Sequence, residues 1–357
     1  MPYNEAFPAM EYDSIYMERC IELAINGLGK TAPNPLVGSV IVHNNLIIGE
    51  GYHHRYGDHH AEVRAISIVR NRELLKDSTL YVSLEPCCHH GKTPPCTDLI
   101  LESGIPRVVI GTTDPFDEVA GKGIAKLRSN GCDVKVGVLK DKCRALNKRF
   151  FTFHEKKRPY VILKWAETAD GYIDTVRTPG SVNRPTWITS EKLRMLVHKW
   201  RTEEASIMVG TQTALKDNPM LNIRDWHGPS PIRLVTDRFL KLPGTLHLMD
   251  GSQPTVIFNE VKQEREGQLH YVRISFREKL PEQIMQYLYA EGIQSLLVEG
   301  GRQLLQSFID DGLWDEARIF TGKQFFGNGV RAPEIIPSRP VSYIPVGTES
   351  LYLIYNA

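Results

Sequence analysis

The spacing of apolar residues in the first 150 positions alternates between helical and strand periods. Tyr16, Cys20, Leu23 and Ala24 share one helical face. Apolar runs at 36–42 and 46–50 flank His43-Asn44-Asn45, which indicates a β-hairpin. Strands separated by helices favour a mixed or parallel sheet covered on both faces. The other elements expected here are strands at 79–83, 107–111 and 134–138, and helices at about 60–70, 97–103 and 123–129.

A charged stretch, residues 154–159, interrupts this pattern, and a second series of strands and helices follows it. With roughly 150 residues per domain, 357 residues predict two domains. We expect the first domain to span 1–153 and the second 154–357, both of the α/β class. The expected elements of the second domain are strands at 160–164, 207–209, 232–235, 255–258 and 295–298, and helices at 190–201, 281–291 and 303–310.

Composition narrows the functional classes. Hydrophobic residues make up 41% and charged residues 24%, and 43 basic residues against 42 acidic ones leave a net charge of +1. This balance argues against a protein that coats nucleic acid or an anionic membrane, and no run approaches the ~18 apolar residues of a membrane span. The N-terminal residues lack the pattern of a signal peptide, so we expect a cytoplasmic protein without nucleic-acid or membrane partners.

The cysteines are unevenly spaced. Cys87, Cys88 and Cys96 fall within ten positions, whereas Cys20, Cys132 and Cys143 are isolated. In a reducing compartment a cluster of this kind predicts metal ligands or catalytic thiols rather than disulfides. Buried packing is the expected role of the isolated three.

The strongest chemical signal is His60-Ala61-Glu62 followed by Pro86-Cys87 and then by Cys96. One histidine and two thiolates form a catalytic zinc set with a fourth position left for water, and Glu62 is then available to move protons. His-x-Glu followed by Pro-Cys-x-x-Cys is the signature of zinc nucleobase deaminases. Here eight residues rather than two separate the cysteines. We expect His60 and Glu62 on the first turn of a helix, and Cys87 at the start of another.

The alternative is a closed structural zinc site with Cys88, His89 or His90 as the fourth ligand. A closed site has no use for a carboxylate such as Glu62, so the catalytic interpretation is preferred.

Longer strings extend this interpretation. The segment Leu84 to Cys96, with Pro33-Asn34-Pro35-Leu36-Val37-Gly38 and His60-Ala61-Glu62, closely resembles the bifunctional riboflavin-biosynthesis deaminase/reductase family. The resemblance implies a cytidine-deaminase-like three-layer α/β domain followed by a dihydrofolate-reductase-like α/β domain. It also implies deamination of 2,5-diamino-6-ribosylamino-4(3H)-pyrimidinone 5′-phosphate. NADPH-dependent reduction of the ribosyl side chain to ribityl would follow, giving 5-amino-6-ribitylaminouracil 5′-phosphate.

For the deaminase the resemblance implies one zinc per chain, held by His60, Cys87 and Cys96, with Glu62 as the proton shuttle. Asn34 would contact the base or ribose. The implied residues for the phosphate end are His53, His54, His89 and Lys92. A solvated loop is the alternative for His53 and His54.

For the reductase, Val298-Glu299-Gly300-Gly301 ends a strand and precedes a helix, where backbone N–H groups can approach a phosphate. No G-x-G-x-x-G fingerprint is present. By resemblance the NADPH site would contain Ala166, Trp187, Thr213, Asp217, Gly301, Arg302, Gln303, Leu304, Leu305, Gln306 and Ser307. The substrate site would contain Arg201, Leu221, Arg224 and Glu299.

Surface salt bridging is the alternative role of Arg201 and Arg224. The family often has a serine before Trp187-Ile188-Thr189, where this chain reads Asn183-Arg184-Pro185-Thr186.

The alternative functions are a nucleoside or tRNA deaminase with a diverged second domain, and an interaction module with structural zinc. The near-neutral charge counts against tRNA. The expected partner is a small pyrimidine ribosyl phosphate, and the expected assembly a homo-oligomer, either a dimer or a tetramer.

Overall fold

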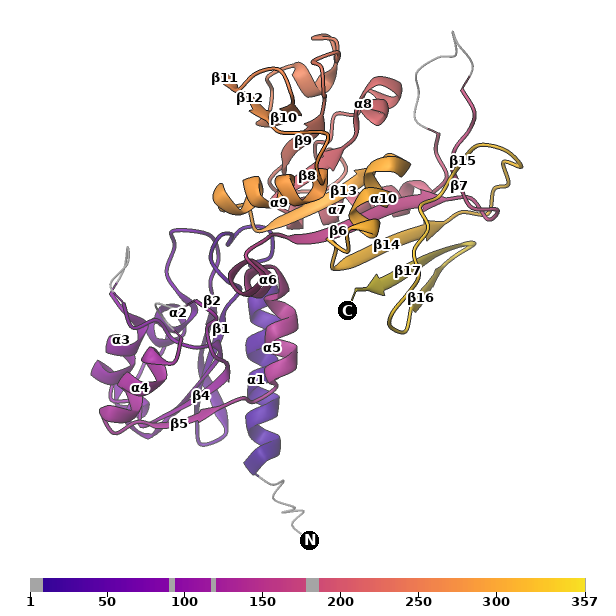
Figure 1. Ribbon diagram of the computed structural model, residues 1–357. Coiled ribbons are helices and arrows are strands. Elements are labelled where there is room, and N and C mark those ends of the chain that lie inside the picture. Colours follow the sequence, from indigo (N-terminus) through magenta and orange to yellow (C-terminus); the bar gives the residue numbers. More distant parts are fainter. Residues whose placement is uncertain (1–8, 90–93, 117–119, 178–185, 357) are drawn as a thin grey trace. The chain divides into compact units, whose positions relative to one another are not determined.

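The chain forms two compact units, Met1–Lys157 and Arg158–Ala357 (Figure 1). The computed structural model describes residues 9–89, 94–116, 120–177 and 186–356. The division expected at 153/154 falls inside helix α6 (Lys148–Lys156). Residues 154–156 of the charged stretch continue this helix, while Phe150 and Phe151 bury its other side. The division between the two units falls later in the same stretch, between Lys157 and Arg158.

Unit 1 contains a five-stranded sheet in the order β2-β1-β3-β4-β5. The hairpin strands β1 and β2 are antiparallel, β1 pairs with β3 antiparallel, and β3, β4 and β5 run parallel. The strands are β1 (Gly38–His43), β2 (Leu46–Tyr52), β3 (Thr79–Leu84), β4 (Arg107–Thr112) and β5 (Asp133–Val136). The helices are α1 (Ala9–Ile25), α2 (Ala61–Ser67), α3 (Cys96–Glu102), α4 (Lys122–Ser129), α5 (Lys140–Leu146), α6 and the 3₁₀ helix η1 (Arg72–Asp77).

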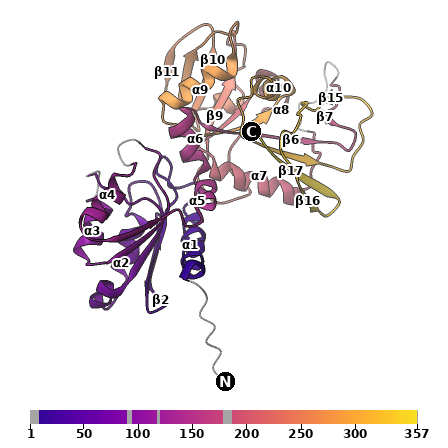
Figure 2. The same ribbon diagram turned by 60° about the horizontal axis from the view of Figure 1, so that its bottom comes forward.

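The alternation of side chains along these strands produces two apolar layers, one on each face of the sheet. Ile41, Val82 and Ile110 pack with residues of α2, α3 and α4, whereas Val40 and Val109 pack with residues of α1 and α5. Figure 2 shows the sheet between these two groups of helices. The result is the three-layer α/β domain expected from the sequence.

Unit 2 contains a ten-stranded sheet in the order β11-β12-β10-β9-β8-β13-β6-β14-β17-β16. The seven strands from β12 to β14 run parallel, and antiparallel strands flank them at both edges. The strands are β6 (Tyr160–Glu167), β8 (Ser206–Val209), β9 (Ile232–Thr236), β10 (Thr255–Asn259), β11 (Glu264–Glu266), β12 (Leu269–Arg273), β13 (Ser295–Gly300), β14 (Glu316–Thr321), β16 (Ser342–Val346) and β17 (Glu349–Tyr355). Strands β7 (Tyr172–Asp174) and β15 (Val330–Arg331) form a separate pair.

Helices cover both faces of this second sheet. Val161, Leu296 and Val298 pack with residues of α9 and α10, and Ile207 and Val235 pack on the opposite face with a residue of α8. Helix α7 packs against β14 and β17. The helices are α7 (Glu191–Glu203), α8 (Thr211–Asp217), α9 (Leu280–Ala290), α10 (Arg302–Asp310) and the 3₁₀ helix η2 (His247–Met249). Within the described residues, no helix is long and apolar enough to cross a membrane.

Candidate active sites

The first candidate site lies at the ends of helices α2 and α3 in unit 1. His60 is the N-cap of α2, and Cys96 is the first residue of α3. His60 Nδ1 lies 3.3 Å from Cys96 Sγ and 3.6 Å from Cys87 Sγ, and the three ligand atoms lie within 4.8 Å of one another. One imidazole and two thiols are the donor set of a catalytic zinc site with an open position, so these residues fit the metal.

The loop after β3 carries Cys87, contrary to the expectation that this residue begins a helix. The nearest helix, α3, begins instead at Cys96 after Pro95. Two backbone contacts hold the loop against that helix: Thr97 N–H donates to the Cys87 carbonyl at 3.2 Å, and Cys96 N–H donates to Cys87 Sγ at 3.4 Å. Hydrogen bonds from the Cys96 thiol and from His60 lower the pKa of Cys87 to about 4, so the thiolate is its favoured form. Cys88 is half-buried and outside the three-residue group.

Glu62, the second residue of α2, lies in the interior beside this group. Its side chain is 3% exposed, and burial raises its pKa to about 7. A carboxyl group with a pKa near neutrality can both accept and return a proton. The carboxyl therefore has the properties that a proton shuttle needs.

Asn34 and His53 form a connected pair in the same unit. His53 Nδ1 lies 3.1 Å from the His59 carbonyl, which can only accept, so the proton belongs on Nδ1. His53 Nε2 must then accept from Asn34 Nδ2 at 3.1 Å. Burial lowers the pKa of His53, in agreement with a neutral ring. His53 is thus buried rather than part of a solvated loop, and it fixes the orientation of the Asn34 amide.

The other residues expected at the phosphate end are more peripheral. His54 is half-buried, with its ring 4.1 Å from that of Tyr52, and His89 is exposed. Lys92 and His90 lie outside the described residues.

Sequence reasoning missed Glu85, which holds the backbone at Asp114 and at the start of α4. Its carboxylate accepts backbone N–H bonds from Asp114, Gly121, Gly123 and Ile124 at 3.0 to 3.3 Å. Gly123 must remain small there, because a Cβ would lie 2.2 Å from the Pro86 carbonyl oxygen. The sequence feature that could have identified Glu85 is its position two residues before the metal-ligand candidate Cys87.

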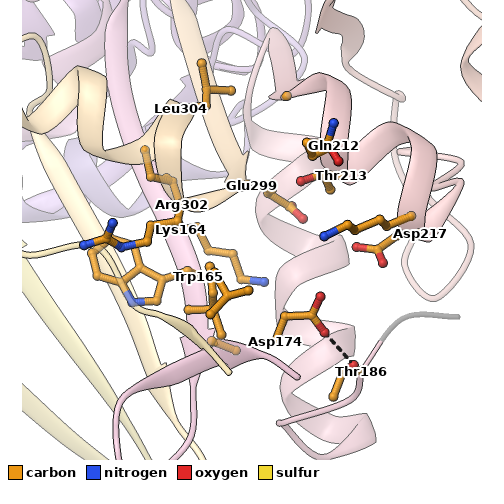
Figure 3. A pocket seen from close by; sticks show the side chains of 18 of the residues that line it. Lys164, Trp165, Asp174, Thr186, Gln212, Thr213, Asp217, Glu299, Arg302 and Leu304 are labelled. Carbon is orange, nitrogen blue, oxygen red and sulfur yellow. Dashed lines mark hydrogen bonds between the residues drawn. The ribbon is translucent and has the colours of Figure 1, made fainter. Parts of the chain in front are cut away.

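The second candidate site is a cavity of about 1190 Å³ in unit 2, which lies at the carboxyl ends of parallel strands (Figure 3). Ligands of open α/β sheets bind at this edge. Among the residues expected from the sequence, those lining the cavity are Ala166, Trp187, Arg201, Thr213, Asp217, Arg224, Glu299, Gly301, Arg302, Gln303, Leu304, Leu305 and Ser307.

Two of the residues expected in this site do not line the cavity. Leu221 is 2% exposed and packs in the apolar core. Gln306 instead bonds to backbone groups of Glu334 and to the Asp310 side chain. Asn183, Arg184 and Pro185 lie outside the described residues, whereas Thr186 donates to Asp174 at 2.8 Å (Figure 3).

Lys164 is one of the charged cavity-lining residues to which sequence reasoning gave no role. Its strand, β6, is otherwise apolar up to Trp165. A lysine that interrupts an apolar strand is the sequence feature that could have identified it. Desolvation lowers the pKa of Lys164, although the carboxylate of Glu299 opposes the shift. Figure 3 shows Lys164 and Glu299 around the same hollow.

The Gly300-Gly301 turn and helix α10 give the cavity a surface suited to a phosphate-bearing cofactor. A Cβ on Gly301 would lie 3.1 Å from Thr213 Oγ1, so the turn has little room for a side chain. The helix begins at Arg302, and the first backbone N–H groups of a helix are free to bind anionic groups. These features and the cavity volume fit a dinucleotide.

Comparisons with known proteins find matches over both units. Residues 10–112 match the cytidine and deoxycytidylate deaminase zinc-binding region, and residues 159–343 match the RibD C-terminal domain. Riboflavin biosynthesis protein RibD of Actinobacillus pleuropneumoniae is 42% identical over 355 residues, covering 97% of this chain and 90% of that protein. The chain belongs to the RibD family.

Solved structures extend this similarity to the whole fold. The Thermotoga maritima deaminase/reductase superposes with a TM-score of 0.87 at 37% identity, covering 98% of this chain and 100% of that one. Acinetobacter baumannii RibD superposes with a TM-score of 0.86 at 29% identity, covering 98% of this chain and 99% of that one. The chain is a bifunctional riboflavin-biosynthesis enzyme with a zinc-binding deaminase domain and a reductase domain that uses a nicotinamide cofactor. The expected fold class and family are confirmed.

Proposed function

We propose that unit 1 deaminates 2,5-diamino-6-ribosylamino-4(3H)-pyrimidinone 5′-phosphate, and that unit 2 then reduces the ribosyl side chain of the product with NADPH. The Thermotoga maritima relative is described as a diaminohydroxyphosphoribosylaminopyrimidine deaminase/5-amino-6-(5-phosphoribosylamino)uracil reductase, which supports these substrates. The observation that carries the proposal is that each unit has its own site with a different chemistry: His60, Cys87 and Cys96 beside Glu62 in one, Lys164 beside Glu299 in the other.

In deamination, water adds to the ring carbon that bears the amino group, and ammonia leaves as the carbonyl forms. Zinc held by His60, Cys87 and Cys96 would supply Lewis-acid activation of the water. Glu62 takes a proton from the water and delivers it to the departing amino group. Since Asn34 donates its N–H to His53, its carbonyl oxygen remains an acceptor for a donor on the base or ribose.

In reduction, the C1′–O bond of the ribose breaks, the N–H proton moves to the ring oxygen as it becomes the 4′-hydroxyl, and a C1′=N imine forms. C1′ then accepts a hydride, and the nitrogen gains a proton. The nicotinamide supplies the hydride. Lys164 is the proton donor, because a half-buried ammonium with a lowered pKa releases its proton more readily than an exposed one. Arg224 has a 46% exposed side chain whose contacts, to Asp225 at 3.8 Å and to Asn222 at 3.4 Å, are long, and we assign it to the substrate phosphate.

We further propose one zinc ion per chain, a homo-oligomeric assembly and a cytoplasmic location. The zinc stoichiometry rests on one three-residue ligand group among the described residues.

The decisive experiment is incubation of the purified full chain with the diaminopyrimidine phosphate, with and without NADPH, followed by mass spectrometry. We expect ammonia and a deaminated product without NADPH, and a second product two mass units heavier with it. Absence of ammonia release from a zinc-replete protein would contradict the deaminase assignment. A deaminated product that NADPH leaves unchanged would contradict the reductase assignment.

A further inference from the structure

The reductase cavity extends across four neighbouring parallel strands. Its lining includes Lys164 on β6, Glu299 on β13, Gly210 directly after β8 and Arg238 shortly after β9. These strands are adjacent in the order β9-β8-β13-β6. Three strand spacings separate the outer two, which places the β9 end about 14 Å from the β6 end. A ligand that reacts beside Lys164 and also reaches Arg238 must therefore be long and extended, as a dinucleotide is.

Asp237, which directly follows β9, is not free to bind a ribose. Asp237 is 2% exposed, and its two oxygens accept the backbone N–H groups of Lys241 and Leu242 at 2.8 Å each. In the Rossmann fold, an acidic side chain hydrogen-bonds the adenosine 2′-hydroxyl of the unphosphorylated dinucleotide. Asp237 cannot do so, because its carboxylate is turned into its own loop.

Arg238 instead presents a cation at this end. Its Nε donates to Glu260 Oε2 at 2.8 Å, and Glu260 Oε1 accepts the backbone N–H of Phe276 at 2.8 Å. The guanidinium lies 4.8 Å from the ring centre of Phe239 and 5.9 Å from that of Phe276. One carboxylate thus holds both the Arg238 guanidinium and the backbone of Phe276. The interaction uses Nε and leaves the two terminal nitrogens available for an oxyanion.

We propose that Arg238 binds the adenosine 2′-phosphate and selects NADPH over NADH. The assignment rests on the proposed function, in which NADPH is the reductant. It adds the residue that distinguishes NADPH from NADH. A guanidinium binds a phosphate dianion through two parallel hydrogen bonds, which a ribose hydroxyl cannot replace. Glu260 is a positioning residue, because it orients Arg238 without lining the cavity.

The test measures binding to the full, zinc-loaded chain by titration calorimetry, with adenosine 2′,5′-bisphosphate and adenosine 5′-monophosphate as probes. We expect the native chain to prefer the bisphosphate by ten- to a hundredfold, the value of a charged hydrogen-bonded pair. Arg238→Gln should lose most of that preference while its affinity for the monophosphate stays the same. Arg238→Lys keeps the positive charge but loses the two parallel N–H donors of the guanidinium. Its preference for the bisphosphate should lie between those of the native chain and of Arg238→Gln.

Lys241→Gln is the matched control. It removes the same charge three residues further along the same loop, from an exposed side chain that does not line the cavity. An unchanged preference in Arg238→Gln, or an equal loss in Lys241→Gln, overturns the proposal. The ratio of reductase kcat/KM with NADPH to that with NADH should fall in parallel. If the native chain reduces the substrate with neither dinucleotide, the proposed function fails, but the two probes still decide the role of Arg238.

Discussion

Arg201 and Glu299 meet through two hydrogen bonds inside the reductase cavity, Nε to Oε1 at 2.9 Å and Nη2 to Oε2 at 2.7 Å. Their side chains are 11% and 8% exposed. Burial alone would raise the pKa of Glu299, but the charges of Arg201 and Lys164 outweigh it and bring the pKa to about 2. Arg201 also donates to the Asn222 carbonyl at 3.2 Å. Arg201 is therefore a buried, paired cation rather than a surface arginine, and Glu299 remains ionised beside Lys164.

The first prediction concerns the pH dependence of reduction. The negative charge of Glu299 raises the pKa of Lys164, whereas Arg201 lowers it. In Glu299→Gln the raising interaction disappears and the unpaired Arg201 remains, so Lys164 should lose its proton at a lower pH. We expect the alkaline limb of the reductase kcat/KM profile to move to lower pH.

Glu203→Gln is the control for that profile. Glu203 lies on α7 and pairs with Lys199 outside the cavity lining, so its loss should leave the limb in place. An unchanged limb in a folded Glu299→Gln would exclude Lys164 as the proton donor.

The second prediction concerns Glu62→Gln. The carboxylate lies outside the group of His60, Cys87 and Cys96, so the amide should leave zinc content unchanged. Deamination should fall by roughly 10²–10⁴-fold, the usual contribution of a general acid–base group. Zinc analysis and an ammonia-release assay measure both. Ammonia release near the native rate would contradict the proposed proton shuttle.

The third prediction separates ligand from neighbour among the clustered cysteines. Cys87→Ser and Cys96→Ser should lower zinc content, because a hydroxyl replaces a preferred thiolate. Cys88→Ser is the matched control, since Cys88 is adjacent but outside the ligand group, and it should retain zinc. Loss of zinc in Cys88→Ser would require a different ligand set.

The sequence predicts the deaminase site better than the reductase site for a physical reason. His60, Glu62, Cys87 and Cys96 fall in two short segments, and their side-chain types define a metal chemistry without any knowledge of the fold. Lys164, Arg201 and Glu299 come from β6, α7 and β13. They meet only because β13 pairs with β6, a strand order that periodicity does not reveal.

Burial was similarly difficult to predict for charged and polar residues. Arg201 on a helix has the same local pattern as a solvated arginine, and His53 the same pattern as a loop histidine. Their partners, Glu299 and Asn34, are distant in the sequence. The prediction that a helix begins at Cys87 was wrong, because eight residues separate Cys87 from Cys96, where α3 begins.

The fourth prediction concerns Glu85. Each carboxylate oxygen accepts two backbone N–H groups, so the amide of Glu85→Gln would leave two buried donors facing another donor. An unsatisfied buried group costs about 1–3 kcal/mol, and we expect the segment at 120–124, which contains the start of α4, to lose about 3 kcal/mol of local stability. Hydrogen exchange of the Gly121, Gly123 and Ile124 amides should accelerate by roughly a hundredfold. Unchanged exchange would show that the segment is held by other contacts.

The fifth prediction is that the reductase unit works alone, provided the fragment includes Arg158. This residue makes two hydrogen bonds to Asp315, at 2.6 and 2.7 Å, and Asp315 also accepts the backbone N–H of Val161 at 2.9 Å. The pair joins the start of β6 to the segment before β14. Breaking a buried ion pair costs about 3–5 kcal/mol, so a fragment that begins at Pro159 should melt at a lower temperature than one that begins at Arg158.

The Arg158 fragment should oxidise NADPH with the deaminated substrate, because nothing in that reduction requires zinc. In the full chain, Arg224→Ala should raise the reductase KM while ammonia release persists, since it removes a phosphate-binding guanidinium from unit 2 alone. Glu62→Gln should have the converse effect, sparing reduction of the deaminated substrate. A folded Arg158 fragment that binds no NADPH would refute the assignment of the cofactor to this unit, because all of the cavity-lining residues lie within it.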